Sequence, residues 1–270
     1  MIQDPLEALS PLDGRYAERA APLRAHLSEA ALIRQRISIE AEWLLALARE
    51  KPAGLPAAAT LTPSVLEAAR RLIDHLPTDA AQAVKKIEQR TNHDVKAVEY
   101  YVREQLQAAG ATAAQLELVH FGCTSEDINN LAYARLLRAA RTTLLGEFQS
   151  VQATLQQWAD LHAALPMLAR THGQTASPTT LGKEFGNVAA RVGLALARWQ
   201  TVTVRGKWNG AVGNFNAHHA AAPAADWPAI SQRFIESMQL APNPLTTQIA
   251  PHDWIGEYCD AVAALAVIRI

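Results

Sequence analysis

The sequence predicts an all-α fold that is built around long helices. Of its 270 residues, 49% are hydrophobic, and the abundance of alanine favours close-packed helices over sheet. Apolar residues between Leu181 and Val202 recur at alternating spacings of four and three, an a/d pattern that requires a partner helix. A second run, from about Asp127 to about Leu165, contains no proline and would form a helix of about 57 Å. A helix of that length is typical of a helical bundle.

The first hundred residues are expected to form shorter helices separated by turns. Residues 1–27 are expected to be irregular, with a turn over Ser10–Tyr16. The next helix should begin at Ser28 and end at Lys51. Further helix starts are expected at Thr62–Pro63, after a Thr78 cap, and after a cap by Asn92 or Asp94 in the helix that continues to Gly110.

The two long helical patterns are joined by a short segment that contains His172. Ser177 is a good N-cap candidate for the second long helix, and Pro178 suits its first position. Residues 207–216 are rich in glycine and asparagine, and glycines let a backbone approach a ligand or another helix closely. The elements expected after them are a short helix from Asp226 to Leu240, an extended segment framed by Pro242, Pro244 and Pro251, and a final helix from His252.

Composition excludes several classes of function. A formal net charge of −1 gives no overall basic field, so neither a nucleic acid nor an anionic membrane is an expected partner. Cys123 and Cys259 provide neither a disulfide framework nor a CxxC pair, which fits a reducing compartment. His218 and His219 are adjacent and would not share a helix face, so no metal is expected. With no signal sequence and no membrane-length apolar run, we expect a soluble cytoplasmic chain without a cofactor.

Two histidine segments are suited to proton transfer or anion binding. His172 lies where rigid helices begin, and a fixed but accessible imidazole can transfer a proton. On position alone, a loop histidine that only hydrogen-bonds the backbone is the simpler interpretation. His93, between Asn92 and Asp94, lies at the positive end of a helix and would favour a nearby anion, with an incidental capping segment as the alternative.

Hydroxyl and guanidinium groups supply two further candidate anion sites. Thr124 and Ser125 precede the long helix, and hydroxyls with free backbone N–H groups at a helix start can bind a carboxylate. Plain N-capping by these residues is the alternative, and both can hold at once. Arg15 beside Tyr16 offers a planar cation and a phenol for a phosphate, although an ordinary surface turn explains the pair better locally.

Five segments, taken in chain order, resemble the adenylosuccinate lyases, a family within the fumarase/aspartase superfamily. These segments are Ser10–Tyr16, Thr91–Tyr100, Cys123–Asn130, Thr171–Gln174 and Asn209–Asn214. The resemblance covers essentially the whole chain. It implies an all-α fold of the fumarase/aspartase type, with a small N-terminal helical domain over residues 1–110. Residues 111–270 would then be the first, incomplete part of a central long-helix bundle.

The resemblance also implies a reaction. The family removes fumarate by β-elimination from adenylosuccinate, giving AMP, and from the succinylaminoimidazole carboxamide ribotide, both in purine biosynthesis. It implies that His172 is the acid that protonates the departing nitrogen. The residues implied to contact substrate are Arg15, Tyr16, Asn92, His93, Asp94, Thr124, Ser125 and Gln248. A homotetramer is implied, in which each active site draws segments from three subunits.

The chain also departs from the family pattern. The loop with a Ser-Ser-x-Met-Pro-x-Lys pattern, which carries the base serine, has no match, and family members continue well beyond this length. The 1–270 chain alone is therefore expected to be inactive. Thr175 stands where many relatives have proline, which should alter the segment only slightly. The alternatives are another superfamily lyase, such as argininosuccinate lyase, or a non-catalytic helical scaffold.

Overall fold

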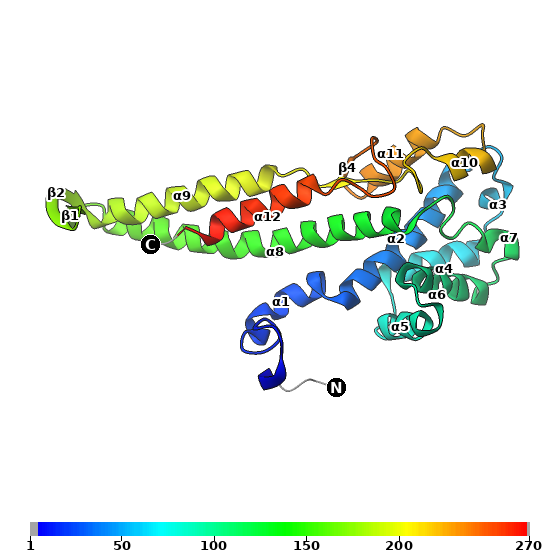
Figure 1. The fold of residues 1–270 in the computed structure, drawn as a ribbon, viewed down its shortest axis with the longest axis horizontal. Helices are drawn as coiled ribbons and strands as arrows, with labels where there is room; N and C mark the ends of the chain where they lie inside the picture. Colours follow the sequence, from blue (N-terminus) through cyan, green and yellow to red (C-terminus); the bar gives the residue numbers. More distant parts are fainter. Residues whose placement is uncertain (1–4, 269–270) are drawn as a thin grey trace. The chain divides into compact units, whose positions relative to one another are not determined.

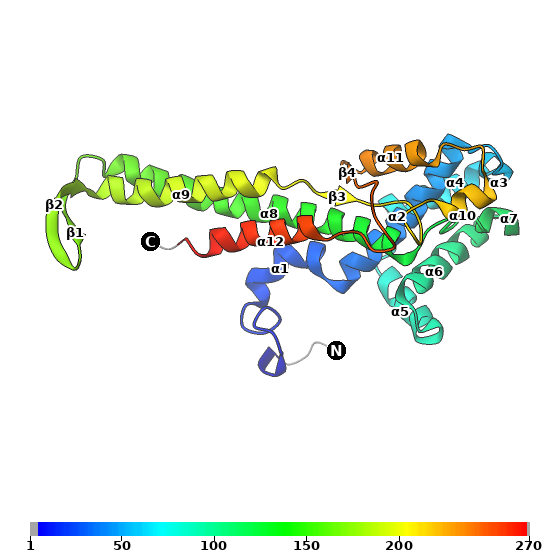
Figure 2. The same cartoon turned by 45° about the horizontal axis from the view of Figure 1, so that its top comes forward.

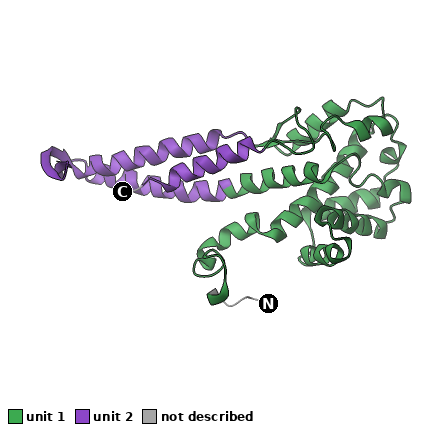
Figure 3. Ribbon diagram, in the orientation of Figure 1, with its two compact units in different colours: residues 1–140, 204–251 green, residues 141–203, 252–270 purple. Residues whose placement is uncertain are grey.

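The computed structural model describes residues 5–268, and most of them are helical (Figure 1). The predicted all-α class is therefore confirmed, although two short two-stranded sheets interrupt the helices of this described part. Contacts divide the chain into two compact units (Figure 3). Unit 1 contains residues up to 140 together with residues 204–251, and unit 2 contains residues 141–203 together with those from 252 onward. The expected domain boundary after residue 110 does not fall at a unit boundary and stays a prediction.

Unit 1 is built from short and medium helices, and the start of the long helix α8 (Ser125–Leu161) belongs to it. Its other elements, in chain order, are the 3₁₀ turn η1 (Pro5–Glu7), α1 (Ala17–Leu27), α2 (Glu29–Glu50), α3 (Pro56–Ala59), α4 (Pro63–Asp74), α5 (Ala80–Thr91), α6 (Asp94–Ala108), α7 (Ala113–Leu116), β3 (Arg205–Gly206), α10 (Asn216–Ala221), α11 (Trp227–Ser237) and β4 (Ala241–Pro242). Strands β3 and β4 pair in parallel.

Predicted helix starts in unit 1 are confirmed where a hydroxyl or carboxylate precedes an apolar run. Ser28 accepts a hydrogen bond from the Ala31 N–H at 3.2 Å as N-cap of α2. Thr62 caps α4 in the same way, with Pro63 in the first position. Asp226 caps α11 by accepting from the Ala229 N–H at 3.1 Å. Each side chain satisfies a backbone donor that the helix leaves without a partner.

Three local predictions in unit 1 are wrong. Residues 17–27 are helical, because the alanine-rich α1 continues through Pro22. Asp79, and not Thr78, precedes α5, and its side chain makes no capping bond. At the start of α6 the N-cap is His93 itself, because its neighbour Asn92 has φ 49° in the left-handed region as the C-cap of α5.

Helix α2 forms the centre of unit 1. Its residues Ile37, Leu44 and Leu47 have no exposed surface. The Trp43 ring packs against the rings of Trp208 and Phe234, with centroids 5.0 Å away in each case. Because α2 is buried on most sides, polar side chains on it are also carried into the interior.

Unit 2 consists of the later part of α8, the antiparallel hairpin of β1 (Pro166–Thr171) and β2 (Gln174–Thr180), α9 (Leu181–Thr201) and α12 (Asp253–Ala266). The hairpin lies beyond the end of α8 and the start of α9, and α12 lies along α9 (Figure 2). The predicted long helix from about 127 to 165 is confirmed to within a few residues. Among the described residues, no helix is long and apolar enough to cross a membrane.

The predicted a/d seam of α9 is confirmed along most of its length. Val188, Val192 and Trp199 are buried, and the Trp199 ring packs against the Tyr258 ring of α12 at 5.3 Å. A side chain at Gly182 would collide with the Ala159 carbonyl, so a glycine is required where α9 begins beside α8.

The predicted start of α9 is wrong. Ser177 and Pro178 lie in β2, and the helix begins at Leu181 with Thr180 as its N-cap. The hairpin pairs Thr171 with Gln174, which leaves His172 and Gly173 as a two-residue turn with φ of 51° and 73°. Positive φ at both central residues matches the twist of the flanking strands. Strand pairing therefore extends to residue 180 and delays the helix.

Candidate functional site

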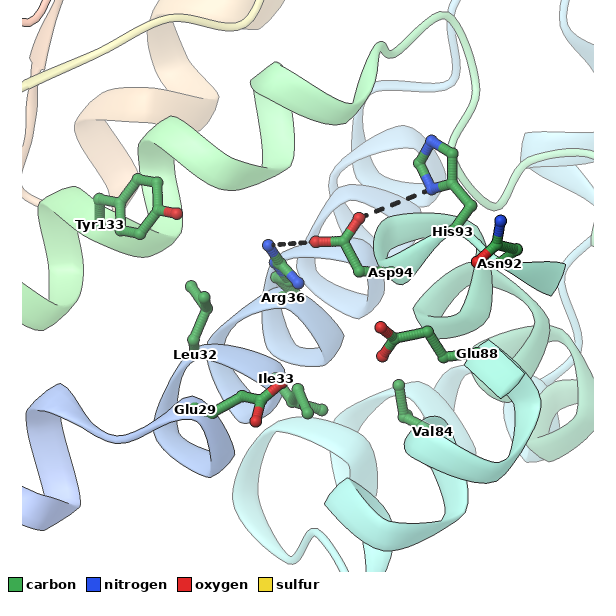
Figure 4. Close-up of a pocket in the computed structure, with 10 residues that line it drawn as sticks. All are labelled: Glu29, Leu32, Ile33, Arg36, Val84, Glu88, Asn92, His93, Asp94 and Tyr133. Atoms are coloured by element: carbon green, nitrogen blue, oxygen red, sulfur yellow. Dashed lines mark ion pairs between the residues drawn. The ribbon is translucent and has the colours of Figure 1, made fainter. Parts of the chain in front are cut away.

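Unit 1 contains a cavity of about 530 Å³ between α2, α5, α6 and α8 (Figure 4). Three predicted site residues, Asn92, His93 and Asp94, line it together. Arg36 of α2 and Tyr133 of α8 line it as well, and neither was predicted from the sequence. The cavity therefore gathers one of the predicted substrate segments around a cation and a phenol that come from other elements.

The turn between α5 and α6 sets the tautomer of neutral His93. Nδ1 of His93 accepts a hydrogen bond from the Lys96 N–H at 3.2 Å. A nitrogen that accepts carries no proton, so in the neutral ring the proton lies on Nε2. The side chain is about half exposed. Neutral His93 can therefore donate a hydrogen bond from Nε2 while its other nitrogen caps the helix.

Asp94 is held by a buried cation. Its Oδ2 lies 2.8 Å from Nη2 of Arg36, and Oδ1 accepts from the Val95 N–H at 2.8 Å. Burial raises the pKa of Asp94. The charge of Arg36 and these hydrogen bonds lower it by more, so the net pKa is below the usual value. Asp94 is thus an anion at neutral pH. No local pattern distinguishes Arg36 from the other charged residues of α2, because its partners lie far away in the sequence.

The start of α8 holds the second predicted segment, Thr124 and Ser125, both half-buried. The Thr124 N–H donates to Oδ2 of Asp127 at 2.8 Å. Oδ1 of Asp127 accepts from Nζ of Lys207 at 2.7 Å and from the Asn209 N–H at 3.0 Å. The side chains of Asp127 and Lys207 are fully buried. This ion pair ties the glycine-rich loop to the helix start.

Gln248 lies in an exposed segment that is fastened to the same end of α8. The Ala250 N–H donates to Oε1 of Glu126 at 3.2 Å. The Thr246 hydroxyl and the Asn209 side chain hydrogen-bond each other at 2.9–3.0 Å. The structure therefore brings Gln248's segment together with the start of α8 through side chains that flank it.

A buried carboxylate–histidine pair was missed by the sequence prediction. Glu40 of α2 is fully buried and accepts from the His120 N–H at 3.1 Å, while its other oxygen lies 2.6 Å from Nδ1 of His120. Burial lowers the pKa of His120, but the charge and hydrogen bond of Glu40 raise it, and the net pKa lies above the usual value. The only sequence signal was the position of His120 just before the Thr124–Ser125 segment.

Arg15, Tyr16 and His172 are not among the residues that line the cavity. Arg15 and Tyr16 are exposed in the turn before α1, where the guanidinium carbon lies 5.7 Å from the centre of the Tyr16 ring. His172 belongs to unit 2, exposed in the turn of the β1–β2 hairpin. Of the nine predicted site residues, unit 1 therefore holds eight. The roles of all nine stay predictions.

Comparison with known proteins finds adenylosuccinate lyases among the relatives of this chain. The chain is 44% identical to the adenylosuccinate lyase of Haemophilus influenzae over 271 positions, which cover 98% of this chain and 58% of the relative. It is 42% identical to the adenylosuccinate lyase of Escherichia coli, with the same two shares covered. The chain thus spans about 58% of the length of these relatives.

Solved structures show the same fold at low identity. A fumarate lyase from Mesorhizobium sp. BNC1 matches with a TM-score of 0.71 at 22% identity, over 91% of this chain and 54% of that chain. The 3-carboxy-cis,cis-muconate lactonizing enzyme from Pseudomonas putida matches with a TM-score of 0.70 at 21% identity, over 92% of this chain and 53% of that one. The sequence model of a lyase family matches residues 14–269. Because this match takes in nearly the whole chain, the protein belongs to the lyase family.

Proposed function

We propose that this protein removes fumarate by β-elimination from adenylosuccinate, to give AMP, and from the succinylaminoimidazole carboxamide ribotide. The observation that carries this proposal is the identity of 42–44% with two adenylosuccinate lyases over 98% of the chain. The position of Asn92, His93 and Asp94 around one cavity of unit 1 supports it. Both substrates carry a phosphate and a succinyl group, so the enzyme must offer several donors to anions.

Each segment has a role that its chemistry supports. Thr124 and Ser125 would hold a succinyl carboxylate, because hydroxyls and backbone N–H groups meet at the positive end of a helix. His93 would donate from Nε2 toward the nucleotide, beside Asn92 and Asp94. The remaining substrate contacts that we propose are a phosphate contact by Arg15 and Tyr16 and a contact by Gln248.

The chemistry needs a base and an acid. A base removes the proton next to a carboxylate, which leaves a carbanion that the carboxylate stabilises. The departing nitrogen must then be protonated, and we assign that role to His172, whose exposed ring can meet a substrate. The base-serine loop of the family has no match in this sequence. Residues 1–270 by themselves should therefore release no fumarate.

Assembly is part of the proposal. We infer a homotetramer in which the segments of unit 1 and the hairpin of unit 2 reach one active site from different subunits. The exposed apolar side chains of α8 in unit 2, such as Val151 and Leu161, support further helix packing. In this arrangement His172 would meet its substrate only in the oligomer.

Ultraviolet absorbance of purified protein from its complete reading frame tests the proposal. With adenylosuccinate the absorbance should change as AMP and fumarate form, and with argininosuccinate no product should appear. A protein that cleaves argininosuccinate instead would be another lyase of the superfamily. A correctly assembled protein that cleaves neither substrate would be a helical scaffold, and the proposed function would be wrong.

A further inference from the structure

Arg36 connects the two segments that hold five of the predicted substrate residues. Its Nη2 lies 2.8 Å from Oδ2 of Asp94, the first residue of α6. Its Nε donates to Oδ1 of Asn129 at 2.9 Å, one turn beyond Ser125 on α8. Figure 4 shows the guanidinium beside Asp94 at the wall of the cavity. One side chain on α2 thus reaches α6 and α8 at once.

Burial makes this connection costly to break. The Arg36 side chain is only 7% exposed, so a guanidinium without its partners would be a buried charge in an apolar setting. The planar group also fixes the angle between its two bonds, since Nε and Nη2 belong to one rigid fork. A lysine at this position would supply a single point charge and could not reproduce both contacts.

The other carboxylates of the cavity do not compete for Arg36. Glu29 and Glu88 each lie 2.8 Å from Nζ of Lys85, so they share a cation of their own. Their pairing leaves Asp94 as the carboxylate that holds Arg36. Arg36 therefore contacts Asp94 of α6 and Asn129 of α8.

We propose that Arg36 is a positioning residue, which fixes the α5–α6 turn of Asn92–Asp94 relative to the first turns of α8 at Thr124–Ser125. This inference rests on the proposed function for the importance of those segments, but its structural content stands without it. Misplacement of a substrate-binding group by about 1 Å can lower a rate about 10²-fold. Loss of Arg36 should therefore act on turnover through the turn and not by removing a substrate contact.

The variant Arg36→Met tests this, with Arg34→Met as the matched control, because Arg34 is an exposed arginine on the same helix. Two quantities are measured on the full-length protein: kcat and KM for adenylosuccinate, and backbone amide exchange by mass spectrometry. We expect Arg36→Met to lower kcat/KM about 10²-fold. Amides of residues 91–96 should exchange faster, while those of α4 stay unchanged. Arg34→Met should match the wild type in both.

Two further variants keep the inference testable if Arg36→Met does not fold. Asn129→Ala removes one of the two contacts and should speed exchange in residues 91–96 less than Arg36→Met does. Arg36→Lys should behave like a partial loss, since it retains the charge without the fork.

The outcomes separate the two proposals. Unchanged exchange in residues 91–96 of a folded Arg36 variant would overturn the positioning role. A raised KM with that unchanged exchange would mean that Arg36 contacts the substrate itself. If the wild type cleaves no adenylosuccinate, the proposed function fails, yet the exchange measurement still decides whether Arg36 positions the turn.

Discussion

The start of α8 in unit 1 and the turn of the β1–β2 hairpin in unit 2 differ in how their polar groups are held. Asp127 at the start of α8 is fully buried and receives hydrogen bonds from Thr124, Lys207 and Asn209. His172 in the hairpin is exposed, and none of the described residues hydrogen-bonds its ring. The segment of Thr124 and Ser125, which we propose holds a succinyl carboxylate, is thus fixed by its own unit. The proposed acid, His172, has no hydrogen-bond partner for its ring among the described residues, so other parts of the proposed oligomer would have to orient it.

The largest effect should follow from His172→Gln, measured on the full-length protein. Loss of a general acid lowers kcat by a factor of about 10²–10⁴. Because the side chain is exposed, the variant should unfold at the wild-type temperature. Met167→Leu, on the same hairpin, is the control and should retain full activity. Near-normal turnover of His172→Gln would show that this histidine is only a turn residue.

The contrasting ion pairs give the next prediction. Lys207→Met leaves Asp127 as an unpaired buried charge and should cost about 3–5 kcal/mol of unfolding free energy. Lys183→Met removes an exposed pair with Glu184 in unit 2 and should cost at most about 1 kcal/mol. Urea unfolding of both variants measures the difference. Similar losses in the two variants would contradict the idea that unit 1 is preorganised by buried charge.

Unit 1 should also lose stability in mild acid because of His218. This histidine is 1% exposed, neither ring nitrogen has a hydrogen-bond partner in the described residues, and burial lowers its pKa to about 4. The unfolded chain binds the proton near pH 6.5, so between pH 6.5 and 4 the unfolded state binds more protons. Stability is therefore lost as the pH falls through this range, by on the order of 3 kcal/mol.

The variant His218→Met removes the imidazole that binds this proton, and it serves as the test. Its unfolding free energy should fall less than that of the wild type between pH 6.5 and pH 4. The comparison must be made between the two proteins, because His120, with its raised pKa, contributes stability that is lost as the pH rises. Parallel pH profiles of wild type and variant would rule out a buried neutral His218.

Features that depend on residues close together in the sequence could be predicted from it, whereas features that depend on distant residues could not. The helix starts at Ser28 and Thr62 and the seam of α9 were predicted correctly, because helix-start signals and heptad spacing are local. The hairpin was missed because residues 166–180 carry no strong alternating pattern and the helix start was placed on the Ser177–Pro178 signal. Arg36, Glu40 and Asp127 were missed because each pairs with residues far away in the sequence.

The last comparison concerns two glycines with similar backbone angles. Gly173 of the hairpin and Gly213 of unit 1 have φ of 73° and 80°. An added Cβ meets nothing within 4 Å at Gly173, whereas at Gly213 it collides with the Thr246 carbonyl. Gly173→Ala should cost about 1–2 kcal/mol from the backbone alone. Gly213→Ala should cost more, and equal shifts in the thermal unfolding temperature would contradict this difference.

The central claim is that unit 1 and the hairpin of unit 2 serve one active site from different subunits. Its most direct measurement mixes His172→Gln protein with His93→Gln protein, each of which should have lost most of its activity, allows the subunits to exchange, and follows adenylosuccinate cleavage. Mixed oligomers would contain sites in which both histidines are intact. We predict that activity returns only after exchange and scales with the statistical fraction of mixed oligomers. If mass spectrometry shows complete exchange and activity stays at the level of the single variants, the shared site is wrong.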